Sequence, residues 1–278
     1  MIQIFNDISR ECSRLTTERY STSFSSAIRL LHADLRGPVY DVYGFVRFAD
    51  EIVDTFHDFD KEKLLQDFKE ETYKAIERGI SLNPILNSFQ ATVNKFNIDK
   101  ALIESFFISM EMDLSSRQYD KDAYEKYIFG SAESVGLMCL YIFCDGDNER
   151  YRKLQPSAQA LGAAFQKINF LRDLKADHEQ LSRTYFPGVN FTNFTEKDKR
   201  AIEKDVITDL DNAYEGIKHL PVKARFGVYL AYKYYCTLFR KIQKSQPSGL
   251  LNNRVRISNS FKALIFVRAG LRSSFNLL

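Results

Sequence analysis

Apolar residues recur every three or four positions along most of this chain, the spacing that places them on one face of an α-helix. No alternating apolar and polar run is long enough to predict a strand. Gly37-Pro38 precedes the first strongly periodic run, and proline favours the first positions of a helix. Asp99 and Asp120 stand where helix N-caps are expected. The predicted helices span residues 39–57, 61–79, 84–96, 99–117, 121–144, 148–178, 197–219, 222–245 and 257–273.

These helices predict an all-α protein. Residues 182–195, which contain Pro187-Gly188, form the longest predicted loop. No stretch has the composition of a linker, and no short repeat is present. We therefore expect residues 1–278 to form one helical domain, which is long enough to bury a sizeable core.

A polar stripe runs along the predicted helix 39–57. Tyr43, Arg47, Asp50 and Asp54 lie at offsets of 0, 4, 7 and 11. At about 100° per residue, these positions fall within a band about 60° wide. Most residues beside the band are apolar. The stripe therefore does not have the surroundings of an ordinary solvent-facing surface.

A second segment repeats this arrangement more than a hundred residues later. Gln166, Asn169, Asp173 and Asp177 lie at offsets of 0, 3, 7 and 11, again on a helix whose neighbouring positions are largely apolar. Each segment thus ends in two aspartates that are one helical turn apart.

Four carboxylates that face one cavity are costly unless cations neutralise them. Mg²⁺ suits such a site, because it takes one or two carboxylates and completes its shell with water and phosphate oxygens. Arg47 and Arg172 would add charge-assisted contacts to a diphosphate. One aspartate pair of this kind is usually a solvated surface feature. Two pairs, each on an apolar helix, favour a magnesium-diphosphate site.

The aromatic content is high, with 23 Phe and 15 Tyr, whereas glycine (12) and proline (6) are scarce and tryptophan is absent. So many aromatic side chains indicate either a large core or a deep cavity for a long hydrocarbon. Composition alone does not distinguish these alternatives.

Charge is distributed unevenly. The first 215 residues carry 27 basic and 36 acidic side chains, whereas the last 63 carry twelve basic and no acidic ones. A basic end indicates diphosphates, anionic lipid or nucleic acid as partners, or simply a solvated basic face. We predict that the helix at 257–273 docks on anionic membrane, with ordinary helix packing as the alternative.

The four cysteines form no C-x-x-C pair and the four histidines are scattered, so neither a zinc site nor a disulfide framework is predicted. The N-terminus lacks a signal-peptide pattern. The longest apolar run, Val135–Cys144, is ten residues, about half of what crosses a bilayer. We expect a cytoplasmic protein that does not span the membrane and contacts its inner face peripherally.

The two polar segments resemble the aspartate-rich motifs of the squalene/phytoene synthase family, and the resemblance covers most of the chain. The first motif is matched by Asp50-Glu-Ile-Val-Asp54, and the second by Gln166, Asn169, Arg172, Asp173 and Asp177. Further matching stretches are Ser21-Thr-Ser23-Phe24, Tyr127 to Gly136, Arg183-Thr-Tyr185-Phe-Pro187, Tyr235 and Arg254-Val-Arg256. Thr22, Phe129 and Glu133 depart from the family pattern, standing where relatives more often carry a basic residue, Tyr and Gly.

The resemblance implies an isoprenoid synthase-type helical bundle around a central cavity. It implies metal ligands at Asp50, Asp54, Asn169, Asp173 and Asp177. It implies substrate contacts from Ser21, Ser23, Phe24, Arg47, Gln166, Asn169, Arg172, Arg183 and Arg254. The aspartates would act in catalysis together with Tyr43, Tyr127 and Tyr235, although core tyrosines with satisfied hydroxyls are an equal alternative for the last three.

The activity that the resemblance implies is the head-to-head condensation of two prenyl diphosphates. We expect two geranylgeranyl diphosphates to give phytoene through a cyclopropyl (prephytoene) diphosphate, with Mg²⁺ or its substitute Mn²⁺. NADPH is not expected, because neither G-x-G-x-x-G nor a P-loop is present. The alternative substrate is farnesyl diphosphate, converted to squalene or dehydrosqualene.

Three other interpretations of the function fit the sequence less well. A chain-elongating prenyltransferase or terpene cyclase also uses two aspartate-rich helices, but the spacing of the second motif fits poorly. A non-catalytic assembly or scaffold protein of this fold is expected to lose metal-binding aspartates, and all four stand here. A nucleic-acid binder is not expected, because no recognition motif accompanies the basic end.

Overall fold

The computed structural model describes residues 1–115, 119–179, 185–189, 194–252, 254–258 and 265, with the side chains of residues 175–179 and 252 outside this set. The described chain is helical and contains no strand, which confirms the predicted all-α fold. The helices are α1 (Ile2–Tyr20), α2 (Thr22–Ile28), α3 (Ala33–Asp54), α4 (Lys61–Arg78), α5 (Pro84–Phe96), α6 (Lys100–Ser115), α7 (Lys121–Ile128), a π-helical turn η1 (Phe129–Glu133), α8 (Ser134–Cys144), α9 (Asn148–Glu179), α10 (Glu196–His219), α11 (Val222–Lys244) and α12 (Pro247–Asn252).

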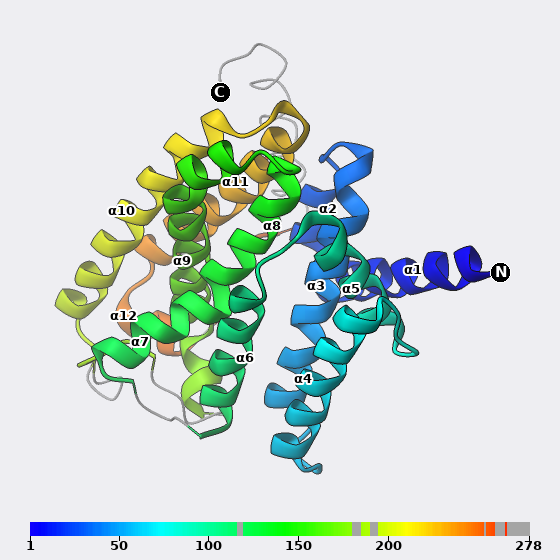
Figure 1. Cartoon of the computed structure of the whole chain (residues 1–278). Helices are drawn as coiled ribbons and strands as arrows, with labels where there is room; N and C mark the ends of the chain where they lie inside the picture. Colours follow the sequence, from blue (N-terminus) through cyan, green and yellow to red (C-terminus); the bar gives the residue numbers. More distant parts are fainter. Residues whose placement is uncertain (116–118, 180–184, 190–193, 253, 259–264, 266–278) are drawn as a thin grey trace.

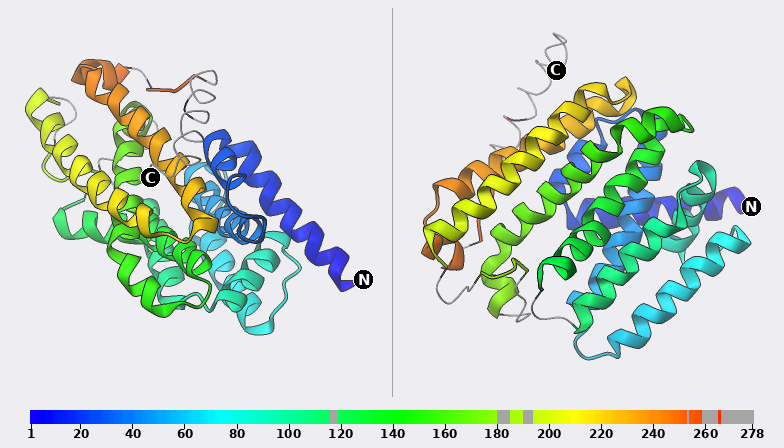
Figure 2. Two further views of the ribbon diagram at one scale, coloured as in Figure 1. Left: turned by 90° about the horizontal axis from the view of Figure 1, so that it is seen from above. Right: turned by 60° about the vertical axis from the view of Figure 1, so that its left-hand side comes forward.

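The long helix α9 lies in the middle of the bundle (Figure 1). It packs against α8 and η1, and also against α10, α11 and α12. Helix α3 packs against α8, α1 and α5, and α1 projects from the bundle at the N-terminal end, as both views in Figure 2 show. The two helices with polar stripes, α3 and α9, therefore share α8 as a neighbour.

Helix ends follow local signals in the sequence. The Asp120 carboxylate caps α7 by accepting from the Ala123 N–H, as predicted. The Asp99 carboxylate accepts from the Ala101 N–H at the start of α6. At the C-terminal end of α4, Gly79 adopts φ +71°, a left-handed conformation that glycine takes without strain.

The two N-terminal helices were not predicted, for a physical reason. The face of α1 that packs inward carries the small polar residues Ser9, Ser13 and Thr17, all fully buried. Its exposed face carries apolar residues that include Ile4 and Ile8. A search for an apolar stripe facing a core therefore finds no clear signal here.

The predicted start of the next helix was wrong. Helix α3 begins at Ala33 rather than near Val39, and Pro38 is buried in its second turn. Proline lacks the N–H that would bond to the carbonyl of Asp34, so the helix loses one hydrogen bond near its N-terminus. The remaining predicted helices up to residue 245 match the observed ends within two residues.

The predicted helix 257–273 lies largely outside the described residues, and residues 254–258 are not helical. Membrane docking by this region stays a prediction. Within the described chain, one continuous helical stretch, Lys121–Cys144, is long and apolar enough to cross a membrane by length and composition. Half of its most apolar window is buried inside the fold, and a single such helix is weak evidence for a membrane span.

Phenylalanines form much of the core between α3, α4, α5 and α6. Phe45 stacks on Phe89 with ring centroids 3.9 Å apart, and it also contacts Phe106 and Phe107. All four rings are fully buried. Burying one such side chain contributes about 1.5–3 kcal/mol to stability. Part of the high Phe content thus belongs to an ordinary core.

A buried carboxyl lies on the same face of α3 as Phe45, one helical turn away, where α3 packs against α1 and α5. Asp41 is fully buried and accepts a hydrogen bond of 2.7 Å from the Thr92 hydroxyl. Its Oδ1 has no hydrogen-bond partner in the described chain. Burial raises the pKa of Asp41 to about 7, since removing a carboxylate from water disfavours its charged form.

Asp41→Asn is predicted to remove a pH dependence of stability. The folded state keeps the Asp41 proton up to about pH 7, whereas the unfolded chain loses it near pH 3.9. The contribution of Asp41 to the free energy of unfolding therefore falls as pH rises from about 4 to 7, by at most about 4 kcal/mol. Urea unfolding of both proteins at several pH values measures the difference. Parallel stability curves for wild type and variant would contradict this account.

Candidate active site

One cavity of about 570 Å³ lies between α2, α3, α8, α9 and α11. It is polar at one end, where Asp50 and Asp173 line it. Much of the remaining wall is apolar or aromatic, and includes Phe24, Val39, Val42, Leu140, Phe143, Leu154, Leu161, Phe165, Phe170 and Leu220. Phenylalanine therefore serves both of the predicted alternatives, since some rings fill the core and others line a cavity.

The first polar stripe faces this cavity from α3. Tyr43, Arg47, Asp50 and Asp54 all line it. The Arg47 guanidinium lies 3.9 Å from Asp50, is hydrogen-bonded to Glu51 and stands 4.3 Å above the Tyr20 ring. Glu51, beside the stripe, thus helps to hold Arg47 in place.

The second stripe faces the same cavity from α9. Gln166, Asn169, Arg172 and Asp173 line it. The Asp173 carboxylate accepts hydrogen bonds from the guanidinium of Arg172 at both of its oxygens, and Arg254 Nε lies 2.6 Å from Oδ1. Arg254 therefore brings the basic end of the chain back to the second motif.

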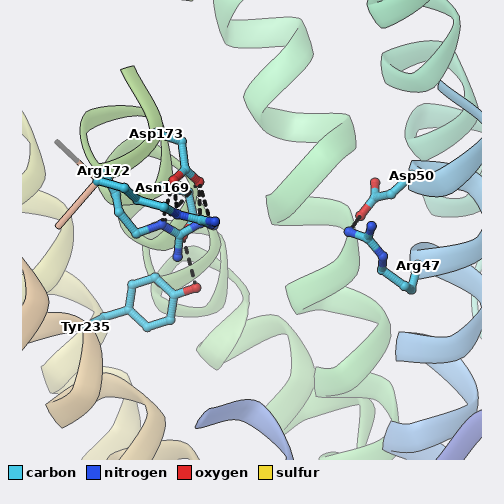
Figure 3. A network of polar contacts seen from close by, with 7 residues as sticks. Arg47, Asp50, Asn169, Arg172, Asp173 and Tyr235 are labelled. Carbon is cyan, nitrogen blue, oxygen red and sulfur yellow. Dashed lines mark hydrogen bonds and ion pairs between the residues drawn. The ribbon is translucent and has the colours of Figure 1, made fainter. Parts of the chain in front are cut away.

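Figure 3 shows the two motifs on opposite sides of the site, with Arg47 and Asp50 on one wall and Asn169, Arg172 and Asp173 on the other. They come from positions more than a hundred residues apart in the sequence. The expectation that both acidic segments face one cavity thus agrees with the geometry for Asp50, Asp54 and Asp173. The side chain of Asp177 and all of Arg183 lie outside the described residues, so their roles stay predictions.

Two of the three candidate tyrosines stand close to the motifs. Tyr235 donates a hydrogen bond of 3.3 Å to the Asn169 side-chain oxygen, and its ring stacks on Phe165 at 3.7 Å. Burial raises the pKa of Tyr43 to about 12 and also raises that of Tyr235. Both phenols therefore stay protonated and neutral near pH 7.

The candidate residues at the start of α2 differ in whether they line the cavity. Ser21 caps α2 by accepting from the Phe24 N–H at 3.2 Å, and both residues line the cavity. Ser23 is not among the lining residues, so its predicted substrate contact has no support from the cavity.

The π-helical turn η1 forms the part of the cavity wall that lies directly beside α9. A side chain at Gly130 would place its Cβ 2.0 Å from the Ser105 carbonyl oxygen, and one at Gly162 would meet the Ala132 carbonyl at 2.7 Å. These glycines let α6 and α9 approach the turn closely. Ser131 and Ala132 line the cavity as a result, and the Gln166 amide lies 3.4 Å from the Ser131 hydroxyl.

Glu133, one of the departures from the family pattern, does not line the cavity. Its carboxylate accepts a hydrogen bond of 3.0 Å from Gln159 on α9. Burial raises its pKa above the usual range. Phe129 is also absent from the lining. Neither departure changes the cavity wall directly.

Sequence reasoning missed one acid on the cavity wall. Asp113 of α6 is buried and accepts a hydrogen bond of 2.8 Å from the Tyr127 hydroxyl. It lies in a largely apolar helix, and no second acid stands three or four residues away from it in the sequence. Its place becomes apparent from its hydrogen-bond partners, Tyr127 on α7 and Tyr185 after α9.

The oxygen donors at the polar end fit Mg²⁺, although they form no closed cage. Within the described residues, no three His, Cys, Asp or Glu side chains gather into a site for one ion. Mg²⁺ usually takes one or two carboxylates and completes its shell with water and phosphate oxygens. Asp50 and Asp54 on one wall and Asp173 on the other would hold Mg²⁺, which would supply positive charge to a bound diphosphate. The buried Nε of Arg47 has no hydrogen-bond partner in the described chain, as expected of a group that binds an anionic ligand.

Comparison with known proteins identifies the family. The family model "squalene/phytoene synthase" matches residues 17–260, so the chain belongs to the squalene/phytoene synthase family. Its members are prenyltransferases that join two prenyl diphosphates head to head, generally with a divalent metal. The recognition of the family and of the enzyme class from the sequence is therefore confirmed.

Three relatives illustrate the range of the family. The chain is 24% identical to a 4,4'-diapophytoene synthase of Staphylococcus haemolyticus, covering 89% of this chain and 91% of the relative. It is 25% identical to a phytoene synthase of Arthrospira platensis, with 95% and 93% covered. A crystal structure of a dehydrosqualene synthase superposes with a TM-score of 0.85 at 20% identity, over 98% of both chains, which supports the isoprenoid synthase-type fold.

Asp50→Asn and Asp173→Asn are each predicted to weaken the binding of pyrophosphate at saturating Mg²⁺ by at least about tenfold, or 1.4 kcal/mol. Without Mg²⁺ the same variants should bind pyrophosphate no more weakly than wild type, because a repelling carboxylate has been removed. Isothermal titration calorimetry measures both affinities. Asp58→Asn, an exposed acid beyond the end of α3, is the matched control. Equal affinities for wild type and both site variants at saturating Mg²⁺ would contradict the assignment.

Proposed function

We propose that this protein condenses two geranylgeranyl diphosphates head to head to give phytoene, through a cyclopropyl diphosphate and without NADPH. One observation carries the proposal. Two acid- and arginine-bearing helices, distant in sequence, line the polar end of a single cavity whose other walls are mostly apolar. A diphosphate with a long hydrocarbon tail has the same division between a charged and an apolar part.

The arginines of the polar end have the chemistry to bind the diphosphate. Arg47 on α3, Arg172 on α9 and Arg254 after α12 all line the cavity. Guanidinium groups bind phosphate oxygens with directed, charge-assisted hydrogen bonds. Mg²⁺ held by Asp50, Asp54, Asp173 and Asp177 would neutralise the charge that develops on the leaving diphosphate. Asn169 and Gln166 present further oxygens beside these acids.

Aromatic side chains next to the polar end suit an allylic cation. Phe24, Phe165 and Tyr235 form one cluster of rings that lines the cavity. Ring faces stabilise a nearby cation by about 0.5–2 kcal/mol each. The same rings exclude water, which would otherwise capture the cation as an alcohol.

The extent of the apolar wall bears on the length of the substrate. Lining residues on α9 run from Asp173 back to Leu154, a distance of about 28 Å at 1.5 Å per residue. An extended geranylgeranyl chain is about 19 Å long and a farnesyl chain about 14 Å, taking bonds of about 1.5 Å in a zigzag. The wall has the length for a C20 chain, and we therefore favour geranylgeranyl diphosphate. Farnesyl diphosphate is the second candidate, because the relatives include a diapophytoene synthase.

Purified protein with Mg²⁺ and no NADPH is predicted to convert geranylgeranyl diphosphate to phytoene. Gas chromatography with mass detection of the extracted hydrocarbons measures the product, and separate reactions with farnesyl diphosphate measure the competing activity. A C30 product from farnesyl diphosphate alone would contradict the C20 assignment. Elongated diphosphates, cyclic terpenes or no turnover of either substrate would contradict head-to-head condensation itself.

Ala158→Phe is predicted to shorten the chain that the cavity accepts. Ala158 lines the cavity and lies about 22 Å from Asp173 along α9. A phenyl ring at this position should lower the kcat/KM for geranylgeranyl diphosphate relative to farnesyl diphosphate by at least about tenfold, because the longer tail loses its place. Lys153→Phe, on the exposed face of α9, is the control for added apolar bulk. An unchanged ratio would show that the chains do not extend along this wall.

A further inference from the structure

The apolar end of the cavity is closed by two leucines that lie in turns between helices. Leu31 lies in the turn between α2 and α3, Leu220 lies in the turn between α10 and α11, and both line the cavity. Gly216, one helical turn before Leu220, lies against α9 near Leu154, because its Cβ would stand 2.2 Å from that of Ser157. Both turns lie at the same end of the bundle (Figure 1). They therefore form the end wall that is farthest from the acids of the second motif.

This end wall is thin. Leu31 and Leu220 are only 3% and 6% exposed, yet each lies one or two residues from a solvent-exposed side chain. The side chain of His32 is 50% exposed, and Val222 is 80% exposed. Leu31 packs against Gly227 of α11, where a Cβ would lie 2.5 Å from Leu31 Cδ2. Displacement of the two leucines would therefore connect the cavity to the surface.

The polar contacts that join the two turns are exposed to solvent. The His32 N–H donates a 2.9 Å hydrogen bond to the Lys223 carbonyl oxygen. Lys223 Nζ donates a 3.4 Å hydrogen bond to the Asp34 carboxylate, which lies 3.0 Å from His32 Nδ1. The side chains of all three residues are at least half exposed, and exposed ion pairs add little to stability. These contacts therefore hold the turns together without preventing their separation.

Each turn is also held to its own following helix by an arginine. Arg36 Nε donates a 2.8 Å hydrogen bond to the Leu31 carbonyl oxygen. The Arg225 guanidinium donates two, of 3.1 and 2.9 Å, to the Leu220 carbonyl oxygen. Hydrogen bonds from a charged donor are stronger than those between neutral groups. Each turn can thus keep its shape while the contacts between the turns break.

The products of the proposed reaction have opposite solubilities. Two prenyl diphosphates give one hydrocarbon, two pyrophosphates and one proton. Pyrophosphate is stable in water at the polar end, where metal ions and arginines can accompany or release it. The hydrocarbon is insoluble in water, and its passage between acids and arginines would separate them from their polar partners. Release at the apolar end avoids that passage.

We propose that the turns around Leu31 and Leu220 separate to release the hydrocarbon product into lipid from the apolar end of the cavity, an inference that rests on the proposed function. These two turns are named the gate. Substrates enter and pyrophosphate leaves at the polar end, between α3 and α9. The gate closes after each turnover, and water is thereby kept from the allylic cation of the next one.

A cross-link between the two turns tests the gate. In His32→Cys/Lys223→Cys the two Cα atoms lie within about 7 Å of each other, since the backbones share a hydrogen bond. With phosphatidylcholine vesicles present, the reduced variant should turn over within about threefold of the wild-type rate. The oxidised variant should complete one turnover and release its pyrophosphate, while the hydrocarbon stays with the protein on gel filtration. Later turnovers should be slower by at least about tenfold.

The matched control places a cross-link away from the cavity. Glu70→Cys/Lys74→Cys replaces an exposed ion pair on α4, a helix that does not line the cavity. A short bismaleimide joins the two thiols of either variant, so the comparison does not depend on disulfide formation. The control cross-link should leave the first and the later turnovers unchanged. Mass spectrometry measures the extent of each cross-link.

The outcomes separate this inference from the proposed function. Wild-type protein that makes no head-to-head product contradicts the proposed function and the gate with it. Active wild type, with a fully cross-linked gate that still delivers hydrocarbon to vesicles at the rate of the reduced variant, contradicts the gate alone, because the product then leaves at the polar end. A cross-link that prevents even the first turnover also contradicts it, because substrates are proposed to enter elsewhere.

Discussion

Negative charge from two distant helices is concentrated at one end of a largely apolar cavity, and this charge must be neutralised. In the structure, arginines fulfil that requirement. Arg47 lies beside Asp50 on α3, while Arg172 and Arg254 hold Asp173 on α9. Each arginine would be able to bind a phosphate oxygen if metal ions neutralised the acids in its place. The same side chains thus balance the charge of the acids and are suited to bind the ligand.

This requirement explains why α3 has two different polar faces. The face towards the cavity carries the stripe that begins at Tyr43, with its acids paired to arginine. The face towards α1 and α5 carries Asp41, which is fully buried and has its pKa raised to about 7. A neutral carboxyl is the less costly form there, because the cost of burying the charge outweighs the attraction of Arg10. The two faces therefore use different ways to hold a carboxyl group inside the protein.

The sequence predicted the features that repeat at helical spacing. The helices from α4 to α11 and the two stripes have strong periodic patterns, and the described stripe residues line the cavity, whereas Ser23 does not. Helix α1 was not predicted because its buried face is polar. The place of Asp113 on the cavity wall was not predicted because a single acid forms no periodic pattern. The π-helical turn could not be predicted either, since it depends on the close approach of Gly130 and Gly162 to other helices. Whether the chain forms one domain and whether its basic end contacts membrane stay predictions.

In the proposed complex, carboxylates from α3 and α9 together bind one metal-bound diphosphate, and the prenyl tail extends along α9. A crystal structure with Mn²⁺ and a non-hydrolysable geranylgeranyl thiodiphosphate, with anomalous scattering used to locate the metal, tests this most directly. The account predicts anomalous peaks in contact with Asp50 and Asp173, a diphosphate between them and a tail that passes Leu161 towards Leu154. Metal bound away from these acids, or a tail that leaves the cavity towards solvent, would contradict it.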